Sequence, residues 1–110
     1  MIRQRFGDTE IPILRKAAEG QNCIRCNFKD DTTVGAHYTG ARRMSYGGGF
    51  GRKVHDLVMA HLCARCHTWM DQLARKDGSP EWEHSEEFLH LVMLTIIRLF
   101  DQGYLVVKNP

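Results

Sequence analysis

Apolar residues recur at helical spacing through the last third of the chain. They fall three or four positions apart, so they would line one face of a helix: Phe88, Leu91, Val92, Thr95, Ile96, Leu99 and Phe100. Ser79 can cap this helix, Pro80 suits its first position, and Gly103 can end it. The pattern predicts a long C-terminal helix whose apolar face covers a core, followed by a strand from Tyr104 to Lys108.

The pattern in the rest of the chain predicts four shorter elements. They are a helix from about Glu10 to Gly20, a strand from Thr32 to Tyr38, a second strand from Val54 to Leu62, and a helix from Ala64 to Leu73. The segment between the strands, Thr39 to Lys53, is rich in glycine and is predicted to be a loop. At 110 residues the chain has the usual size of one domain. We therefore expect a single α+β domain over residues 1–110.

Four cysteines form two pairs of identical spacing, and the chain has no others. Cys23 and Cys26 make the first C-x2-C pair, and Cys63 and Cys66 make the second. Two such pairs far apart in sequence are typical of a structural zinc site, in which four thiolates surround the ion. Disulfides are the alternative, but the opening residues MIRQRFGDTE lack the apolar core of a signal peptide. The sequence predicts bound Zn²⁺ and a reducing, cytoplasmic location.

Composition adds only weak constraints on function. Hydrophobic residues make up 43% and charged residues 25%, which are ordinary values for a globular protein, and the formal net charge is +2. No apolar run is long enough to predict a membrane span. The placement of the positive charge is more informative, because four cations flank the glycines of the predicted loop: Arg42, Arg43, Arg52 and Lys53. Glycine-rich backbone approaches phosphates closely, so these cations are candidate DNA contacts; the alternative is a solvated loop.

Polar residues near the cysteine pairs supply the candidate chemistry. His37 lies on the first predicted strand, and Asp56 lies near the start of the second. His67 directly follows Cys66, and Asp71 comes one helical turn later on the same face. A neutral imidazole can accept a proton at neutral pH, and imidazole also binds metals.

These motifs together resemble the HNH, or ββα-metal, nuclease superfamily, and most closely its small YbcO-type members from phages and prophages. The resemblance covers about Ile13 to Asp71 and rests on a cysteine knuckle, a strand histidine in GAHYTG, a glycine-rich loop, and HLCARCHTWMD. It implies a treble-clef-like zinc domain that hydrolyses DNA phosphodiester bonds in recombination or replication. By motif position, His37 would be the general base, Asp56 would orient it, and His67 would bind a catalytic cation such as Mg²⁺ or Mn²⁺.

The chain departs from the family pattern at one position. Family members commonly carry Asp or His, the second cation ligand, directly before the base, and here that residue is Ala36. Asp56, Asp71 or His37 itself could supply the ligand, or the site could be degenerate. The rival hypothesis is a non-catalytic zinc module that binds nucleic acid or a protein. A third is a structural adaptor that forms a homodimer through the C-terminal helix.

Each candidate also has a structural explanation. His37 could be a core histidine that donates to a carbonyl group, Asp56 could form a turn, and His67 could support the zinc ligands. The other histidines are expected at the surface or in packing contacts: His55, His61, His84 and His90. Trp69 and Trp82 are expected to anchor the core or its edge.

Overall fold

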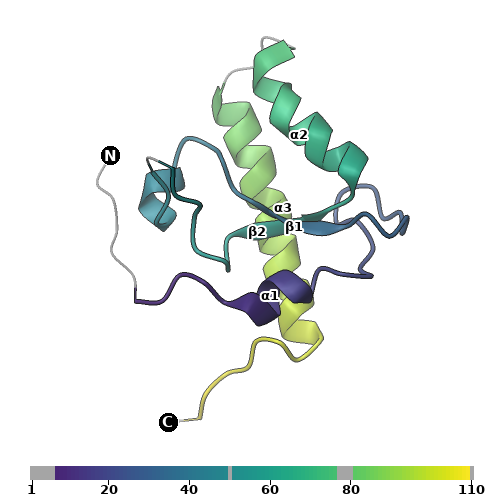
Figure 1. The fold of residues 1–110 in the computed structure, drawn as a ribbon, viewed down its shortest axis with the longest axis vertical. Helices are drawn as coiled ribbons and strands as arrows, with labels where there is room; N and C mark the ends of the chain where they lie inside the picture. The colour runs from purple at the N-terminus through teal and green to yellow at the C-terminus, as the bar shows by residue number, and fades with distance from the viewer. Residues whose placement is uncertain (1–6, 50, 77–80, 110) are drawn as a thin grey trace.

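The fold is α+β, with a two-stranded sheet and three α-helices. The computed structural model describes residues 7–49, 51–76 and 81–109, without the side chains of residues 74–76 and 81. In chain order the elements are α1 (Pro12–Lys16), β1 (Val34–His37), the 3-10 helix η1 (Arg43–Tyr46), β2 (Met59–Leu62), α2 (Ala64–Lys76) and α3 (Glu81–Asp101). Figure 1 shows the small sheet lying across α3, with α2 beside the upper part of α3 and α1 below the sheet.

The register of the sheet determines at which end of the strands each candidate residue lies. β1 and β2 are antiparallel, with Val34 opposite Leu62 and His37 opposite Met59. Cys63 directly follows β2, so the second cysteine pair leaves the Val34 end of the ladder. His37 lies at the other end, about 10 Å away along the strand at the usual rise per residue. The hairpin therefore separates the knuckle from the candidate base.

The main core lies between the sheet, α2 and α3. Its largest fully buried side chains include Tyr38, Phe88, Leu62 and Met70. The ring of Tyr38 meets that of Phe88 edge to face, with 5.5 Å between ring centroids. Aromatic pairs in this geometry add a favourable quadrupole term to the burial of their surface. This contact fixes α3 against the residue that directly follows His37.

A second, smaller core attaches the N-terminal helix. Leu14 of α1 packs with Met59 and Leu99, and all three are buried. Ile11 and Leu57 pack against them. This apolar contact holds α1 beside the end of the sheet where His37 lies, because Met59 is the pairing partner of His37.

The C-terminal helix is apolar on two faces. The predicted core face is confirmed for Phe88, Leu91, Val92, Thr95 and Leu99, which are buried. Phe100 was expected on that face, but it is 52% exposed and points elsewhere. A second row on α3 is also exposed, at the four-three spacing of a helix-pairing seam: Met93, Ile97 and Phe100.

Several predicted boundaries differ from the structure. β2 is shorter than predicted, because Asp56 N–H donates to the Thr9 carbonyl and Val58 N–H closes a turn onto His55. α1 ends at Lys16 rather than Gly20 and is followed by turns. The predicted helix from Ala64 extends to Lys76.

Two further predictions concern the C-terminal region. The strand predicted from Tyr104 to Lys108 is wrong, since this segment is not in a strand and Tyr104 N–H instead caps α3 by donating to the Leu99 carbonyl. Trp82, expected as a packing residue, is 66% exposed. The proposed cap at Ser79 and Pro80 lies outside the described residues. Across the described part of the chain, no helix is both long and apolar enough to span a bilayer.

Candidate functional site

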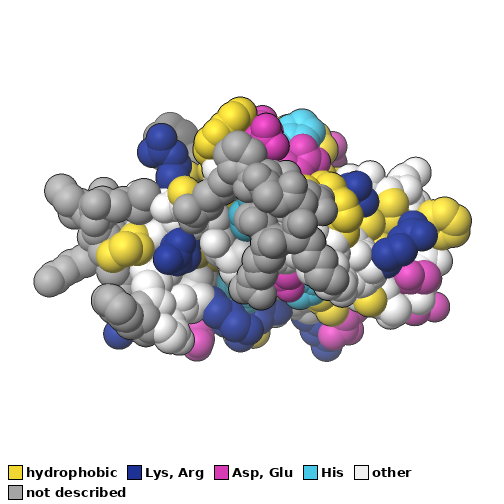
Figure 2. Space-filling view, turned by 90° about the horizontal axis from the view of Figure 1, so that it is seen from above, with side chains coloured by type: hydrophobic (Ala, Val, Ile, Leu, Met, Phe, Trp, Pro, Cys, Tyr) yellow, Lys and Arg dark blue, Asp and Glu magenta, His cyan; other side chains and the backbone are white. Residues whose placement is uncertain are grey.

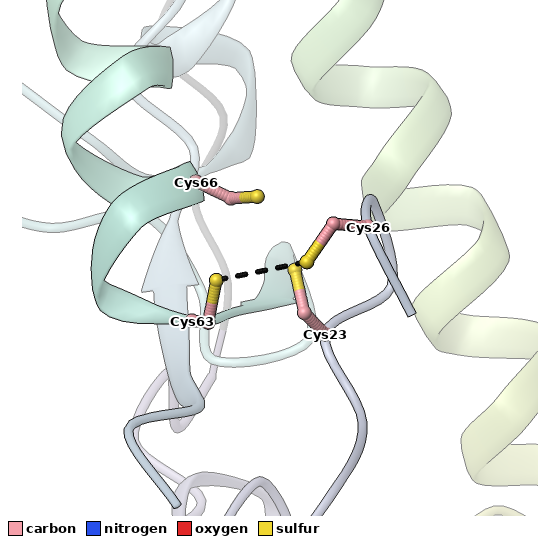
Figure 3. Close-up of side chains that lie close together, drawn as sticks. All are labelled: Cys23, Cys26, Cys63 and Cys66. Atoms are coloured by element: carbon pink, nitrogen blue, oxygen red, sulfur yellow. Dashed lines mark hydrogen bonds between the residues drawn. The ribbon is translucent and has the colours of Figure 1, made fainter. Parts of the chain in front are cut away.

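The two cysteine pairs come together at one point. The first pair lies in a turn that Asn27 N–H closes onto the Cys23 carbonyl, and Ile24 N–H docks this turn on the His61 carbonyl of β2. The second pair brackets the first turn of α2. All four sulfur atoms lie within 4.8 Å of one another, and Figure 3 shows the four side chains pointing toward one another. The sulfurs of Cys26 and Cys63 are 3.8 Å apart.

This arrangement fits a zinc ion. A zinc–sulfur bond of about 2.3 Å in a tetrahedron places neighbouring sulfurs about 3.8 Å apart. All four thiols are free, so no disulfide competes for them. The prediction that Cys23, Cys26, Cys63 and Cys66 could hold zinc agrees with the structure.

The acidity of these thiols also points to a cation. Burial, together with the neighbouring sulfurs, raises the pKa of Cys66 to about 12 against the lowering effect of the Arg25 contact. Burial also acts on Cys23, but the surrounding backbone N–H groups outweigh it and lower its pKa to about 6. One sulfur therefore ionises easily while another resists, as expected when several negative charges would share a small volume. A divalent cation would remove this repulsion.

Arg25 gives the cluster a further positive contact. Its guanidinium lies 3.5 Å from the Cys66 sulfur and 3.6 Å from the centre of the Trp69 ring. The stacked ring restricts the arginine, so its charge stays directed at the thiolate.

The candidate base and its candidate orienting residue are in direct contact. Nε2 of His37 lies 2.8 Å from Oδ1 of Asp56, although 19 residues separate them. Asp56 is buried with 1% of its side chain exposed, whereas 12% of His37 is exposed. The pair thus has one fully buried member and one that reaches solvent.

The other carboxylate oxygen of Asp56 is held by the N-terminal segment. Ile11 N–H donates to Oδ2 at 2.7 Å, and Arg15 Nε donates to the same atom at 2.8 Å. Burial alone would raise the pKa of Asp56. The hydrogen bonds from His37, Ile11 and Arg15 outweigh burial and hold this pKa below its ordinary value. Asp56 is therefore ionised at neutral pH.

An ionised Asp56 determines the tautomer of its partner. A carboxylate only accepts hydrogen bonds, so the proton between the two residues is on Nε2 of His37. This assignment follows from the hydrogen-bond network. Nδ1 then carries the lone pair, and no protein group among the described residues donates to it. His37 can accept a proton at Nδ1, as a general base requires.

His67 lies in a different part of the molecule from this pair. Its Nε2 is 3.8 Å from Oδ2 of Asp71, one turn along α2, and both side chains are partly exposed. The structure does not bring His67 together with His37 and Asp56 as a ligand set. Within the described ranges, the four cysteines form the one group of three or more His, Cys, Asp or Glu side chains placed to share an ion.

The basic loop begins beside the His37–Asp56 pair. Tyr38, which follows His37, accepts the Arg42 N–H at its hydroxyl group and packs its ring 5.8 Å from that of Tyr46. His55, which precedes Asp56, donates its N–H to the Tyr46 carbonyl. Gly40 packs so closely on the Tyr38 hydroxyl that a Cβ atom would overlap it. η1 is therefore anchored to the immediate neighbours of both residues.

The predicted cations of this loop are exposed. Arg42 and Arg43 lie at the start of η1, and Arg52 and Lys53 lie after the glycines. Phe50, which lies among the glycines of this loop, is outside the described residues. Figure 2 shows dark blue cationic side chains scattered among other types on the face seen from above, where grey atoms cover part of the view.

Three polar contacts could not be predicted from the sequence. Ile11 contributes a backbone N–H, which leaves no pattern in the sequence. For Arg15 the sequence predicts only an exposed position on a helix. His61 was expected at the surface or in packing, and it is fully buried. Burial and the Arg98 guanidinium, 3.2 Å from its Nδ1, lower the pKa of His61 to about 4, so it is neutral.

The geometry thus offers a metal-binding cluster of thiols, a histidine able to accept a proton, and exposed cations close to that histidine. Comparison of this chain with protein-family models, with curated proteins and with solved structures finds no match.

Proposed function

We propose that the protein is a metal-dependent DNA endonuclease that hydrolyses phosphodiester bonds. The observation that carries this proposal is the 2.8 Å contact between His37 and a buried, ionised Asp56. Nε2 of His37 is fixed by this contact, and no protein group among the described residues donates to Nδ1, so that nitrogen is placed to accept a proton. The order of cysteine knuckle, antiparallel hairpin and helix also supports the treble-clef-like ββα-metal fold that the sequence resembles.

In the proposed reaction, Nδ1 of His37 takes a proton from a water molecule as the water oxygen bonds to phosphorus. The bond from phosphorus to the 3′ oxygen then breaks, and that oxygen gains a proton from solvent. Asp56 holds the imidazole in the required tautomer and stabilises the imidazolium that forms. The resemblance would assign a divalent cation to His67, whose nearest carboxylate is Asp71, but these two residues lie apart from the His37–Asp56 pair, so a cation held there is not part of the step above.

Substrate contact would come from the basic loop. Arg42 and Arg43 leave the protein from η1, which is anchored to the neighbours of His37 and Asp56. Such cations bind phosphates of any sequence through counterion release. The substrate class is therefore DNA backbone rather than a particular base sequence.

The rival function is a non-catalytic zinc module that binds nucleic acid. Two observations favour it: Ala36 stands where the family carries a cation ligand, and His67 is not grouped with His37. Measuring metal content separates the two functions. One tightly bound zinc per chain suits both, whereas a second, exchangeable divalent cation suits only the nuclease. Cleavage of duplex, single-stranded or branched DNA in Mg²⁺ or Mn²⁺ would establish the enzyme.

The homodimer stays a prediction, and the surface through which two chains would pair is defined. The exposed row on α3 has the spacing that pairs helices, and its centre is Ile97, which is 54% exposed. A monomeric mass for the wild-type protein in light scattering would exclude a stable pair. A dimer that Ile97→Glu converts to a monomer would support it.

A further inference from the structure

The N-terminal helix α1 contributes a cation to the His37–Asp56 pair. Arg15 donates from Nε to Oδ2 of Asp56 at 2.8 Å, on the opposite side of the carboxylate from His37. Asp56 is 1% exposed, while 46% of the Arg15 side chain is exposed. The guanidinium therefore begins at a buried carboxylate and ends in solvent.

Within the part of the chain that the structure describes, most of the donors of Arg15 have no protein partner. A guanidinium has five N–H donors, and Asp56 takes the one on Nε. The nearest other carboxylate, Glu10, is 3.9 Å from a terminal nitrogen and is 76% exposed, so it competes only weakly with another anion. The terminal nitrogens form the planar fork that matches two phosphate oxygens.

The charges of Arg15, Asp56 and His37 also favour the binding of an anion beside Arg15. The carboxylate of Asp56 and the guanidinium of Arg15 compensate each other, so the group is neutral while His37 is neutral. A proton accepted by His37 would leave one net positive charge. A phosphodiester beside Arg15 would then face a cluster whose charge rises when His37 accepts a proton.

We propose that Arg15 binds a phosphate group of the DNA backbone through its exposed terminal nitrogens while its Nε positions Asp56. This inference rests on the proposed function for the identity of the substrate. It adds a contact from a segment that precedes the cysteine knuckle and that the sequence did not single out. The competing explanation is that Arg15 serves only as the counter-ion of a buried carboxylate.

The experiment compares zinc-loaded wild-type protein with Arg15→Gln, Arg15→Lys and Lys16→Gln. Lys16 is an exposed neighbour on the same helix and controls for the loss of any one charge. Binding to a short DNA duplex is measured over a range of salt concentrations without added Mg²⁺ or Mn²⁺. Arg15→Gln should make the slope of log affinity against log salt shallower by about one unit, and Lys16→Gln should leave it unchanged. Arg15→Lys should keep most of the slope.

A second readout tests the positioning role. Long-range proton–nitrogen NMR spectra show which nitrogen of His37 carries the proton. Arg15→Gln should weaken the preference for the Nε2 tautomer, because Asp56 would lose one of the donors that fix its plane. Thermal unfolding of each variant establishes that it is folded at the temperature of the measurements.

The outcomes separate this inference from the proposed function. A shallower slope specific to Arg15→Gln, in a protein that cleaves no DNA, would support the phosphate contact and remove the nuclease. An unchanged slope in a folded Arg15→Gln protein would overturn the contact, and so would equal changes in Arg15→Gln and Lys16→Gln. If the tautomer changes while the slope does not, Arg15 is only the counter-ion.

Discussion

Nε2 of His37 and Oδ1 of Asp56 lie 2.8 Å apart, with the second oxygen of Asp56 held by α1. The carboxylate is thus shared between the end of the sheet and the N-terminal segment. It connects the fold to the candidate chemistry, because the contacts that bury Asp56 also set the orientation of His37. Changes at Asp56 should therefore affect both stability and activity.

Asp56→Asn should lower the free energy of unfolding by about 2–3 kcal/mol. The amide keeps the size of the side chain, but it cannot accept all three hydrogen bonds or balance the charge of Arg15. Unfolding by denaturant, with zinc present for both proteins, measures the difference. Phe100→Leu on the exposed face of α3 is a matched control and should change stability little.

The pH dependence of this deficit has a definite sign. The pKa of Asp56 lies below its ordinary value of 3.8 in the folded protein, so its stabilisation is complete above the ordinary value. That stabilisation is lost only as the pH falls through the lower, folded-state pKa. The contribution of Asp56 itself should therefore be lost only below about pH 4. A deficit of Asp56→Asn that shrank as the pH fell from about 7 to 5 would contradict an ionised Asp56.

Loss of any one zinc ligand should unfold much of the domain. Cys23→Ser and Cys66→Ser each leave three sulfurs for an ion that a closed structural site binds with four. Metal binding and folding are coupled in such sites, so the variants should lose both zinc and cooperative unfolding. Metal analysis measures the zinc content, and circular dichroism measures the cooperativity of unfolding. A wild-type protein that is folded, metal-free and disulfide-bonded would refute the zinc site.

The structure shows which features a sequence pattern can predict. The helical face from Phe88 to Leu99 and the cysteine spacing were predicted, because both depend on local periodicity. Phe100 was misplaced because apolar residues occupy two faces of α3, and periodicity does not say which face is buried. The terminal strand was wrong because a short apolar stretch carries no information about whether a neighbouring strand exists to pair with it.

The candidate site was predictable only in part. His37 and Asp56 were singled out by the family resemblance, and the structure brings them into contact. Their contacts to Ile11 and Arg15 could not be predicted, since a backbone N–H leaves no signature and an exposed arginine is common on any helix. His61 was missed for a related reason, as its burial depends on α3 packing over β2.

Removing the charges of the basic loop should weaken DNA binding without changing its sequence preference. The variant replaces four exposed residues with alanine: Arg42, Arg43, Arg52 and Lys53. Each lost phosphate contact should reduce the salt dependence of binding by about one unit of slope. Fluorescence anisotropy with duplexes of different sequence measures both effects. Unchanged affinity and slope would leave these residues the role of a solvated loop.

The loop variant needs a control for changes in the local structure. Arg43 donates a side-chain hydrogen bond to the Gly40 carbonyl, so its loss could disturb η1 as well as the charge. A variant with lysine in place of the three arginines keeps the charge but not that geometry. It should bind DNA nearly as well as the wild-type protein if charge is the cause.

Alanine substitutions at the two candidate histidines should reduce the activity in different ways. His37→Ala should abolish cleavage while leaving zinc content unchanged, because a general base lowers the barrier. Its stability should fall moderately, because Asp56 loses one of its three donors. The effect on cleavage should be a loss of about 10²–10⁴-fold in kcat. His67→Ala should instead raise the concentration of Mg²⁺ or Mn²⁺ needed for half-maximal activity, because it would remove a ligand.

Cation titrations of both variants distinguish a base from a ligand. High cation concentration should restore much of the activity of His67→Ala and none of that of His37→Ala, since an added ion can compensate for a weaker site but not for a missing proton acceptor. Asp71→Asn should behave like His67→Ala if its carboxylate, 3.8 Å from His67, shares the ion. If purified wild-type protein cuts no DNA with any divalent cation, Ala36 marks a site that has lost its cation. The non-catalytic zinc module is then the better hypothesis for the function.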